Sequence, residues 1–323
     1  MSVMTYAQAS AAAVRAEMIR DKTVWALGED LGRGGVFGQY TGLQAEFGTK
    51  RIVDTPISEA AIMGAAVGAA MMGTRPIVEM RFSDFALCAI DELVNQAAKA
   101  RYMFGGQTRV PLVVREPVGM WRASAAQHSQ SLEAWYTHIP GLVVVMPATA
   151  ADNRGLLAAA IRSDDPVVYM EHKDLWTETG EVPDGDHVVA LGKAATRREG
   201  KDITLISWSR CVQECCAAAT TLATEGIDAE VIDLRTLWPW DREHVLTSVA
   251  RTGRALIVHE AVQVGGFGAE LSAVINEELF TVLKHPVRRL GAPRAPIAYS
   301  PPLEAAVKIA APQVAATVRR MFG

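Results

Sequence analysis

Apolar runs of strand length alternate with helical patterns along the whole chain. Chains with this alternation form parallel sheets whose two faces are covered by helices. The expected fold class is therefore α/β and doubly wound. In the first half the expected strands lie at 23–28, 76–81, 110–115, 142–146 and 166–171, and the expected helices at 6–20, 58–72, 84–103 and 150–162.

The alternating pattern breaks between residues 173 and 201, where Gly, Pro and charged residues gather. A second series follows, with strands expected at 203–208, 229–234, 255–260 and 287–290 and helices at 213–225, 241–252 and 269–283. The chain of 323 residues also exceeds what one hydrophobic core usually organises. We therefore expect two α/β domains, at 1–180 and 201–323, joined by a linker at 181–200 that holds at most one edge strand.

The charge balance excludes several classes of partner. A net charge of −4 with 21% charged residues is typical of globular proteins rather than of nucleic-acid binders. The longest charge-free apolar stretch, at 60–74, is too short to span a bilayer. Thr5 and Gln8 form a capping-box pattern, which predicts the start of a helix rather than a signal peptide. We expect a cytoplasmic protein with no nucleic-acid and no membrane partner.

The four cysteines, Cys88, Cys211, Cys215 and Cys216, contain no C-x-x-C pair. No histidine lies near them at the spacing of a zinc site, so disulfides and structural zinc are not expected. Cys211 and Cys215 would share one face of a helix. We interpret them as small buried hydrophobic residues rather than as a redox or metal pair.

Glu59 is expected in the first turn of a helix, directly after Ser58, a residue type that often caps helices. There the helix dipole alone would stabilise a carboxylate by about 0.3–1 kcal/mol, with no need of an active site. The rest of the helix carries no charge through residue 73, so we expect it to be buried on nearly every side. Enclosure disfavours the charged form of a carboxyl group, and such a group can share a proton with a ring nitrogen. Glu59 is therefore a candidate site residue.

His128 lies in a polar loop, QHSQS at 127–131, that follows an expected strand. Ligand sites of parallel α/β sheets lie at the carboxyl ends of the strands. A histidine there can move protons near neutral pH. For one histidine in one sequence, a hydrogen-bonded structural residue is the more common explanation.

The segment GGFGAE at 265–270 follows an expected strand and opens an expected helix. It resembles half of a dinucleotide-binding fingerprint but lacks the full G-x-G-x-x-G spacing. A tight turn between strand and helix explains the glycines equally well. A nucleotide-binding electron-transfer module therefore stays open as an alternative of another class.

Taken together, several motifs resemble the β subunits of the thiamine-diphosphate-dependent 2-oxoacid dehydrogenases, of the pyruvate and acetoin dehydrogenase type. The motifs are GED at 28–30, GGVF at 34–37, DTPISE at 54–59, RYMFGGQ at 101–107, AQHSQSLEAW at 126–135, HIPGL at 138–142 and EVIDLRTLWPWD at 230–241. They cover nearly the whole chain in order. Their combination is specific, although a single piece such as GGVF would mean little.

The resemblance implies a transketolase-like pyrimidine-binding domain followed by a transketolase C-terminal domain. It also implies an α subunit as partner in a two-α, two-β assembly, with thiamine diphosphate bound between chains. In this family the glutamate that matches Glu59 hydrogen-bonds the aminopyrimidine ring of the cofactor, and the neighbouring Ile57 is implied to contact it. Phe85 matches an aromatic residue that packs on the ring, although core packing alone would also explain it. His128 matches a histidine that assists when the acyl group passes to a lipoyl arm on an acyltransferase core.

The family also implies a potassium ion held by main-chain carbonyl groups. The matching positions are Leu112, Ala160, Ile161, Ser163 and Asp165. An ordinary helix C-terminus would explain the last four positions without an ion. The sequence has no Gly-Asp-Gly motif followed by a distant Asn, the arrangement that holds the diphosphate through a divalent ion, so magnesium is expected on the α subunit. Asp184 and Asp186, in the linker, receive no role.

The substrate is expected to be a small 2-oxoacid or acetoin. EHKDLW at 171–176 and SLEAWYTHIPG at 131–141 resemble acetoin-type or pyruvate-type β chains more than branched-chain ones. The loop at 117–125 departs from the Gly-rich form common in the family, because it contains Met120, Trp121 and Arg122. An alternative within the superfamily is a split transketolase or a deoxyxylulose-phosphate synthase half, which would need basic side chains around this loop to bind a sugar phosphate.

Overall fold

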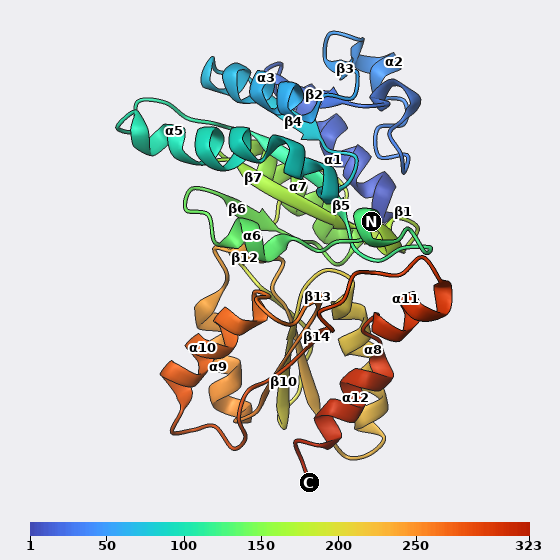
Figure 1. The fold of residues 1–323 in the computed structure, drawn as a ribbon, viewed down its shortest axis with the longest axis vertical. Coiled ribbons are helices and arrows are strands. Elements are labelled where there is room, and N and C mark those ends of the chain that lie inside the picture. Colours follow the sequence, from blue (N-terminus) through green and yellow to red (C-terminus); the bar gives the residue numbers. More distant parts are fainter. The chain divides into compact units, whose positions relative to one another are not determined.

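The computed structural model describes all residues, Met1–Gly323, and they form two compact units (Figure 1). Unit 1 comprises Met1–Val118 and Trp135–Leu191, and unit 2 comprises Gly119–Ala134 and Gly192–Gly323. The units differ from the expected domains in two ways. Residues 119–134 belong by their contacts to unit 2, and the segment 181–200, expected as a linker, is divided between the units after Leu191. None of the helices combines the length and the apolar character that crossing a membrane requires.

Unit 1 contains a parallel sheet in the order β6-β7-β5-β4-β2-β3. A separate antiparallel pair joins β1 to β8. The strands are β1 (Ser2–Thr5), β2 (Val24–Gly28), β3 (Ile52–Asp54), β4 (Arg75–Glu79), β5 (Val113–Val118), β6 (Val143–Val145), β7 (Val167–His172) and β8 (Thr179–Val182). The helices are α1 (Tyr6–Arg20), α2 (Leu43–Phe47), α3 (Glu59–Met71), α4 (Ser83–Ala86), α5 (Ala98–Met103), α6 (Glu133–Thr137), which begins in unit 2, and α7 (Ala150–Arg162).

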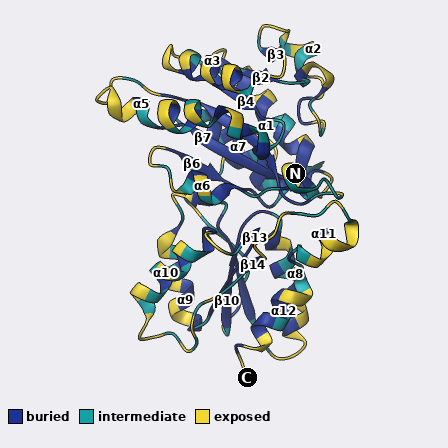
Figure 2. Ribbon diagram, in the orientation of Figure 1, coloured by how far each residue is buried: buried dark blue, intermediate teal, exposed yellow.

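The two faces of this sheet follow from the register. Ala26, Ile77, Val113 and Val167 lie side by side on neighbouring strands, and they share one hydrophobic core with residues of α1 and α7. The alternate residues of the strands point to the opposite face, against which α3 packs next to η3 (Glu92–Ala97). Burial is therefore nearly complete along the strands, and the exposed residues lie mainly on the helices (Figure 2).

Most expected elements of unit 1 are present, with two informative differences. The strand expected at 110–115 begins at Val113 instead, because Pro111 has no N–H group to donate to a ladder. The helix expected at 84–103 is divided into α4, η2 (Leu87–Ala89), the π-helix η3 and α5. By contrast, α1 begins where Thr5 and Gln8 predict it, since both hydrogen bonds of the capping box form.

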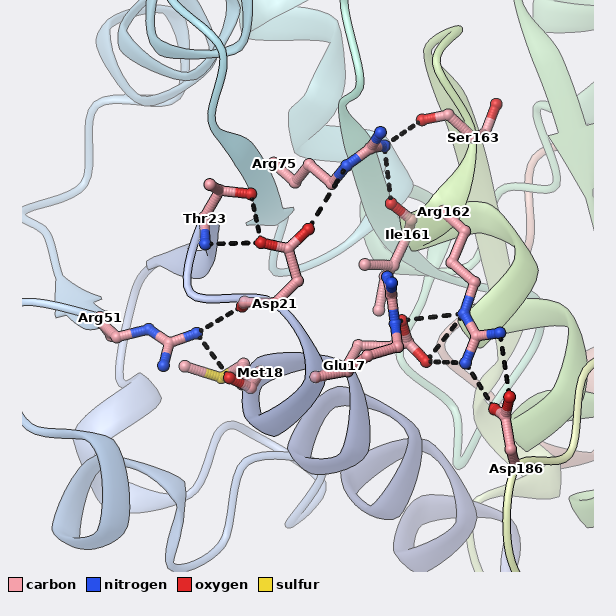
Figure 3. A network of polar contacts seen from close by, with 11 residues as sticks. Glu17, Met18, Asp21, Thr23, Arg51, Arg75, Ile161, Arg162, Ser163 and Asp186 are labelled. Atoms are coloured by element: carbon pink, nitrogen blue, oxygen red, sulfur yellow. Dashed lines mark hydrogen bonds and ion pairs between the residues drawn. The ribbon is translucent and has the colours of Figure 1, made fainter.

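Arginine side chains hold the C-terminal ends of α1 and α7 (Figure 3). Arg51 donates to the carbonyl oxygens of Met18 and Asp21 at 2.9 and 3.1 Å. Arg162, on α7, pairs with the buried carboxylate of Glu17, on α1, at 2.7 Å. Cations at helix C-termini satisfy carbonyl groups that lack intrahelical partners and oppose the helix dipole. These contacts fix the ends of two helices that cover the same face of the sheet.

Unit 2 contains a sheet in the order β14-β13-β10-β11-β9, in which only β9 runs antiparallel to its neighbour. In Figure 1, α9 and α10 lie on one side of these strands and α8 and α12 on the other. The strands are β9 (Ala195–Arg198), β10 (Ile203–Ser207), β11 (Ala229–Asp233), β12 (Thr236–Trp238), β13 (Ala255–Val262) and β14 (Arg288–Ala292). The helices are α8 (Cys211–Ala223), α9 (Arg242–Thr252), α10 (Gly268–Leu279), α11 (Pro301–Val307) and α12 (Ala311–Arg319).

Cys211 and Cys215 lie in α8 and are fully enclosed. Burial raises the pKa of both thiols, which keeps them protonated and unreactive near neutral pH. Their interpretation as small buried hydrophobic residues is confirmed.

Candidate cofactor site

Several charged side chains meet where the first strands of unit 1 end. Glu29 directly follows β2, and Arg81 follows the neighbouring strand β4. Burial raises the pKa of Glu29, and the nearby charge of Glu59 raises it further, while Arg81 opposes both effects. Arg81 also binds Asp30 at 2.8 Å. The carboxyl end of this sheet thus holds two carboxylates, Glu29 and Asp30, around one guanidinium group, in the place where ligands of parallel sheets bind.

Glu59 is the first residue of α3 and is half-buried. The expectation that the Ser58 side chain caps this helix is wrong, because its hydroxyl donates to the carbonyl of Pro56 at 3.1 Å and makes no cap bond. The first N–H groups of α3 therefore lack the usual side-chain acceptor. A carboxylate in this first turn is stabilised by the helix dipole, and it remains accessible to a ligand.

The expected burial of α3 on nearly every side is wrong for this chain. One face, with Ile62, Met63 and Val67, is buried, but the opposite face, with Gly64 and Gly68, is exposed. A groove of about 540 Å³ runs along α3 and is lined by Val67, Met71, Met103 and Phe104 among others. A charge-free helix face of this kind is unusual for a surface exposed to water. The sequence pattern therefore predicted a helix buried on all sides, but unit 1 covers only one face of it.

Phe85 lies in α4, directly after the buried residues Ser83 and Asp84. Its ring packs edge-on against Phe82, with ring centroids 5.5 Å apart, and it is only half-buried. Ile57, in the segment that leads into α3, is 76% exposed. Both residues thus keep apolar surface that the chain itself does not cover.

A buried network of charges lies beside this site and was not predicted from the sequence. Arg115, on β5, is fully buried and binds both carboxylate oxygens of Glu171, on β7, at 2.7 to 2.9 Å. Its other nitrogen lies 3.5 Å from Glu79, on β4. Burial raises the pKa of Glu79 to about 7, against the opposing charge of Arg115. The signal in the sequence was a charged residue near the end of each apolar strand.

Glu79 also reaches the glycine-rich loop before α2. Gln39 donates to its carboxylate at 3.0 Å, and the side-chain oxygen of Gln39 accepts the N–H of Phe37 at 2.8 Å. The GGVF segment at 34–37 is therefore fixed to the end of β4. The role of this motif is to hold a loop beside the site.

Glu116, next to Arg115 on β5, is fully buried, and neither of its carboxylate oxygens makes a hydrogen bond of normal geometry. Burial raises its pKa to about 8, and the charge of Asp84 adds to the effect, while the Tyr136 hydroxyl opposes it. Glu116 is therefore largely protonated at neutral pH. A neutral carboxylic acid in the interior avoids the large cost of an isolated buried charge.

His128 belongs to unit 2, whereas Glu59, Ile57 and Phe85 belong to unit 1. It ends a 3₁₀ turn, η4 (Ala126–His128), and its ring is half-buried. The loop before it has left-handed backbone at three residues that are not glycine: Arg122, Ala123 and Ala125. A cavity of about 540 Å³ lies against this loop, with further walls from the ends of β13 and β14. The loop that carries His128 therefore has an unusual backbone conformation and forms one wall of this cavity.

The five main-chain positions expected to bind potassium already accept hydrogen bonds from the protein. Arg75 donates to the carbonyl oxygens of Ile161 and Ser163 at 3.2 and 2.7 Å (Figure 3). The carbonyl oxygens of Leu112, Ala160 and Asp165 accept from Val167 N, Ser163 N and Ser163 Oγ. Each carbonyl has a second lone pair, so the oxygens suit a cation in kind. At two of them, however, a guanidinium group already supplies positive charge.

The glycines of the segment at 265–270 make room for a side chain of the protein itself. A Cβ atom at Gly266 or Gly268 would lie within 2.9 Å of the His259 ring, and His259 is fully buried. This packing explains the motif without a nucleotide. Asp184 and Asp186, which received no role, pair with the N-terminal amino group and with Arg162.

The comparisons with known proteins cover the whole chain. Residues 2–178 match the family model "Transketolase, pyrimidine binding domain", and residues 192–314 match "Transketolase, C-terminal domain". A solved structure titled "Split gene transketolase, inactive beta4 tetramer" matches with a TM-score of 0.81 over 98% of each chain. Because the identity to it is only 23%, this match shows the fold alone.

Closer relatives share more than two fifths of their residues with this chain. It is 43% identical to the 2-oxoisovalerate dehydrogenase subunit beta of Bacillus subtilis (strain 168), over 99% of both chains. It is 44% identical to the acetoin:2,6-dichlorophenolindophenol oxidoreductase subunit beta of Cupriavidus necator, over 95% of this chain and 94% of that one. It is 43% identical to the pyruvate dehydrogenase E1 component subunit beta of Rhizobium meliloti, over 98% of this chain and 69% of that one. The chain therefore belongs to the family of transketolase-like β subunits of the thiamine-diphosphate-dependent 2-oxoacid and acetoin dehydrogenases.

Proposed function

We propose that this chain is the β subunit of a two-α, two-β enzyme that cleaves a small 2-oxoacid or acetoin on thiamine diphosphate and passes the acyl group to a lipoyl domain. One observation carries the proposal: Glu59, half-buried, begins an apolar helix whose outer face this chain leaves uncovered. Glu59 is the carboxylate that binds the cofactor in this proposal. A partner chain is needed to cover the exposed face of the helix.

Glu59 acts on the aminopyrimidine ring of the cofactor. Its carboxyl group would share a proton with a ring nitrogen of the bound cofactor and would so favour the imino tautomer of the ring. When bound, thiamine diphosphate supplies a nucleophilic carbon and stabilises the charge left when a bond to the substrate carbonyl breaks. Burial and the charge of Glu59 raise the pKa of the neighbouring Glu29.

Phe85 and Ile57 supply the apolar contacts of the same ring. Phe85 is half-buried with one edge against Phe82, and Ile57 is exposed, so both have surface available to a ligand. A flat aromatic ring between an aromatic and an aliphatic side chain gains dispersion and hydrophobic stabilisation. These residues position the ring, and Glu59 changes its protonation.

The α chain completes the site. In the described structure no group of three or more His, Cys, Asp or Glu residues is arranged to hold a metal ion, and we assign magnesium and the diphosphate contacts to the α chain. The uncovered face of α3 is the surface we assign to that partner, because this helix starts at Glu59 and the partner must approach Glu59 to finish the cofactor site. Small residues such as Gly64 and Gly68 let another backbone come close.

His128 assists proton movement when the acyl group passes to the lipoyl arm of an acyltransferase core. His128 is half-buried, and its neighbours Gln127 and Ser129 line a cavity, which places the histidine close to where a second substrate could enter. Replacing His128 with Ala should slow lipoyl acylation more than decarboxylation measured with an artificial electron acceptor. Equal losses in the two assays would reject this division of labour.

Potassium remains part of the proposal at the oxygens of Leu112, Ala160, Ile161, Ser163 and Asp165. An ion there would share two of its oxygens with Arg75. The thermal unfolding midpoint in potassium chloride, compared with choline chloride at equal ionic strength, tests this. A specific rise with potassium supports the ion, and identical midpoints reject it. We also propose a cytoplasmic location.

Reconstitution tests the proposed function. The chain is mixed with the α chain, and thiamine-diphosphate binding is measured by calorimetry for each chain alone and for the pair. We expect tight binding only for the pair. The pair is then assayed with pyruvate, branched 2-oxoacids and acetoin, and with sugar phosphates for ketol transfer. Turnover of sugar phosphates alone would favour the split-transketolase alternative, and tight cofactor binding by this chain alone would contradict the proposal.

A further inference from the structure

The loop at 119–134 is held at both ends by side chains from the sheet of unit 2. We infer that Glu260 is a positioning residue for His128: it fixes Met120, and Met120 fixes the loop that carries the histidine. This inference rests on the proposed function of His128 and adds the device that places it.

The first anchor is at Met120. Its N–H donates to Oε1 of Glu260 at 2.6 Å, and its carbonyl oxygen accepts from Nζ of Lys308 at 3.5 Å. Met120 is buried, and Glu260 is 7% exposed. Both polar backbone groups of one buried residue are therefore bound by side chains from distant parts of the sequence. A hydrogen bond from a backbone N–H to a buried carboxylate is among the stronger types.

Glu260 is itself held in place. It lies near the end of β13, and its other oxygen is 3.5 Å from Nη1 of Arg210. Arg210 also binds Glu214 at 2.7 Å and the carbonyl oxygen of Ile309 at 3.1 Å. The carboxylate therefore cannot follow Met120 if the loop shifts. The anchor is rigid because it is part of a network that joins β13, α8 and the segment before α12.

The second anchor is at Glu133. Nε1 of Trp208 donates to its carboxylate at 3.2 Å. Trp208 follows β10 and stacks on His259 with ring centroids 5.2 Å apart. Burial raises the pKa of Glu133 to about 7. Two strands of one sheet thus supply the two anchors: Trp208, after β10, binds Glu133, and Glu260, near the end of β13, binds Met120.

The chain between the anchors stores conformational strain. Arg122, Ala123 and Ala125 have φ values of 49°, 55° and 65°, which side chains other than glycine adopt at a cost of about 1–2 kcal/mol each. Such residues persist only when their surroundings fix them. If Met120 is released, the strained turn can relax, and His128, eight residues further on, moves with it.

Two substitutions at Glu260 test the inference in the assembled enzyme. Glu260→Gln keeps an acceptor for the Met120 N–H, whereas Glu260→Met has similar length and no acceptor. Glu230→Gln is the matched control, since Glu230 is also a buried carboxylate of unit 2 that pairs with an arginine, Arg251, but it does not contact the loop. Hydrogen exchange at residues 119–131 reports the loop directly. Lipoyl acylation and decarboxylation with an artificial acceptor report the position of His128.

In Glu260→Met we expect exchange of the Met120 amide to rise at least about tenfold. The kcat of lipoyl acylation should fall about 10–100-fold, because small displacements of a catalytic group cost that much, with decarboxylation within about threefold of the parent enzyme. Glu260→Gln should recover most of the acylation rate, and Glu230→Gln should change neither readout. Thermal unfolding and size-exclusion chromatography establish that all variants assemble.

Unchanged exchange at Met120 in Glu260→Met would overturn the inference, as would equal losses in the Met and Gln variants. An equal fall of both activities in Glu260→Met would also overturn it. His128→Ala, assayed in parallel, tests the proposed function independently. If His128→Ala shows no difference between the two assays while exchange at Met120 still rises in Glu260→Met, the role of His128 fails but the anchor on the loop stands.

Discussion

The two parallel sheets of this chain use their carboxyl ends differently. In unit 1 the residues that follow β2, β3 and β4 include Glu29, Glu59 and Arg81, with apolar surface at Ile57 and Phe85 still available. In unit 2 the corresponding ends of β10 and β13 carry Trp208 and Glu260, which bind the chain's own loop at 119–134. The same architecture therefore leaves apolar and charged side chains uncovered at one end, and covers the other end with a loop of its own chain.

This difference shows that a strand end in an α/β fold is a favourable position rather than a function. The polar groups at both ends are carboxylates near the start of a helix or the end of a strand. The two carboxylates differ in what they contact. Glu260 accepts a hydrogen bond from a backbone N–H at 2.6 Å. Glu59 lies half-buried at the start of a helix that has one face uncovered.

The largest effect is expected at Glu59. Glu59→Gln should reduce turnover of the reconstituted enzyme by about 10²–10⁴-fold, the usual contribution of a positioned proton-transfer group. Assembly should be unchanged, because Gln has the same shape and Glu59 makes no contact that holds the fold. Steady-state kinetics and size-exclusion chromatography measure the two quantities.

Glu270→Gln is the matched control for this prediction. Glu270 also lies in the first turn of a helix, α10, at the carboxyl end of the sheet in unit 2, and it is exposed. There the carboxylate interacts only with the helix dipole, worth less than about 1 kcal/mol. Its replacement should leave turnover within about twofold. Normal turnover in Glu59→Gln, or a comparable loss in Glu270→Gln, would remove the distinction between the two sheets.

Local signals made part of this site predictable. The position of Glu59 in the first turn of a helix was predicted correctly because the start of the helical pattern is visible in sequence, and the start of α1 because Thr5 and Gln8 cap it. The outer face of α3 was predicted to be buried and is exposed in this chain, because periodicity shows that a face is apolar but not which chain covers it. The network of Arg115 with Glu79 and Glu171 was missed, since it depends on the register of three strands that are far apart in sequence.

That network distinguishes the interiors of the two units. Arg115 is fully buried between two carboxylates, so Arg115→Met leaves at least one buried charge without a partner. We expect a loss of about 3–5 kcal/mol in the free energy of unfolding, measured by chemical denaturation. In unit 2, Arg197 pairs with buried Asp233 but is itself 21% exposed. Arg197→Met should cost only about 1–3 kcal/mol, and equal losses would show that burial of the guanidinium group is not decisive.

Two buried groups, Glu116 in unit 1 and His259 in unit 2, should respond to pH in opposite directions. The pKa of Glu116 in unit 1 is raised from 4.5 to about 8, so the folded state binds this proton more tightly than the unfolded state. Its stabilising contribution is complete below pH 4.5 and is lost as the pH rises through 8. Between pH 5 and 9 the native chain should lose up to about 3–4 kcal/mol relative to Glu116→Gln. Chemical denaturation of both proteins across this range measures the difference.

In unit 2 the pKa of His259 is lowered by burial from 6.5 to about 4. The unfolded state therefore takes up this proton first, and the stabilising contribution is lost as the pH falls from 6.5 through 4. The native chain should lose up to about 2–3 kcal/mol relative to His259→Gln between pH 7 and 4. A difference that did not change with pH for either pair of proteins would contradict the assigned burial of that group.

The smallest effects compare two glycines at helices of the two units. At Gly268 in unit 2 a Cβ atom would lie 2.9 Å from the His259 ring and 3.1 Å from Ile257, so Gly268→Ala should destabilise the chain by about 1–3 kcal/mol through overpacking. At Gly68 in unit 1 a Cβ atom would meet nothing within 4 Å. Gly68→Ala should therefore stabilise the chain alone by up to about 1 kcal/mol, because alanine favours the helix. The same methyl group should weaken association with the α chain if that chain covers α3, which sedimentation of mixtures at graded concentration would detect. If Gly68→Ala associates with the α chain as tightly as the parent chain does, the α chain binds elsewhere. A partner that packs closely against α3 would leave no room for the added methyl group.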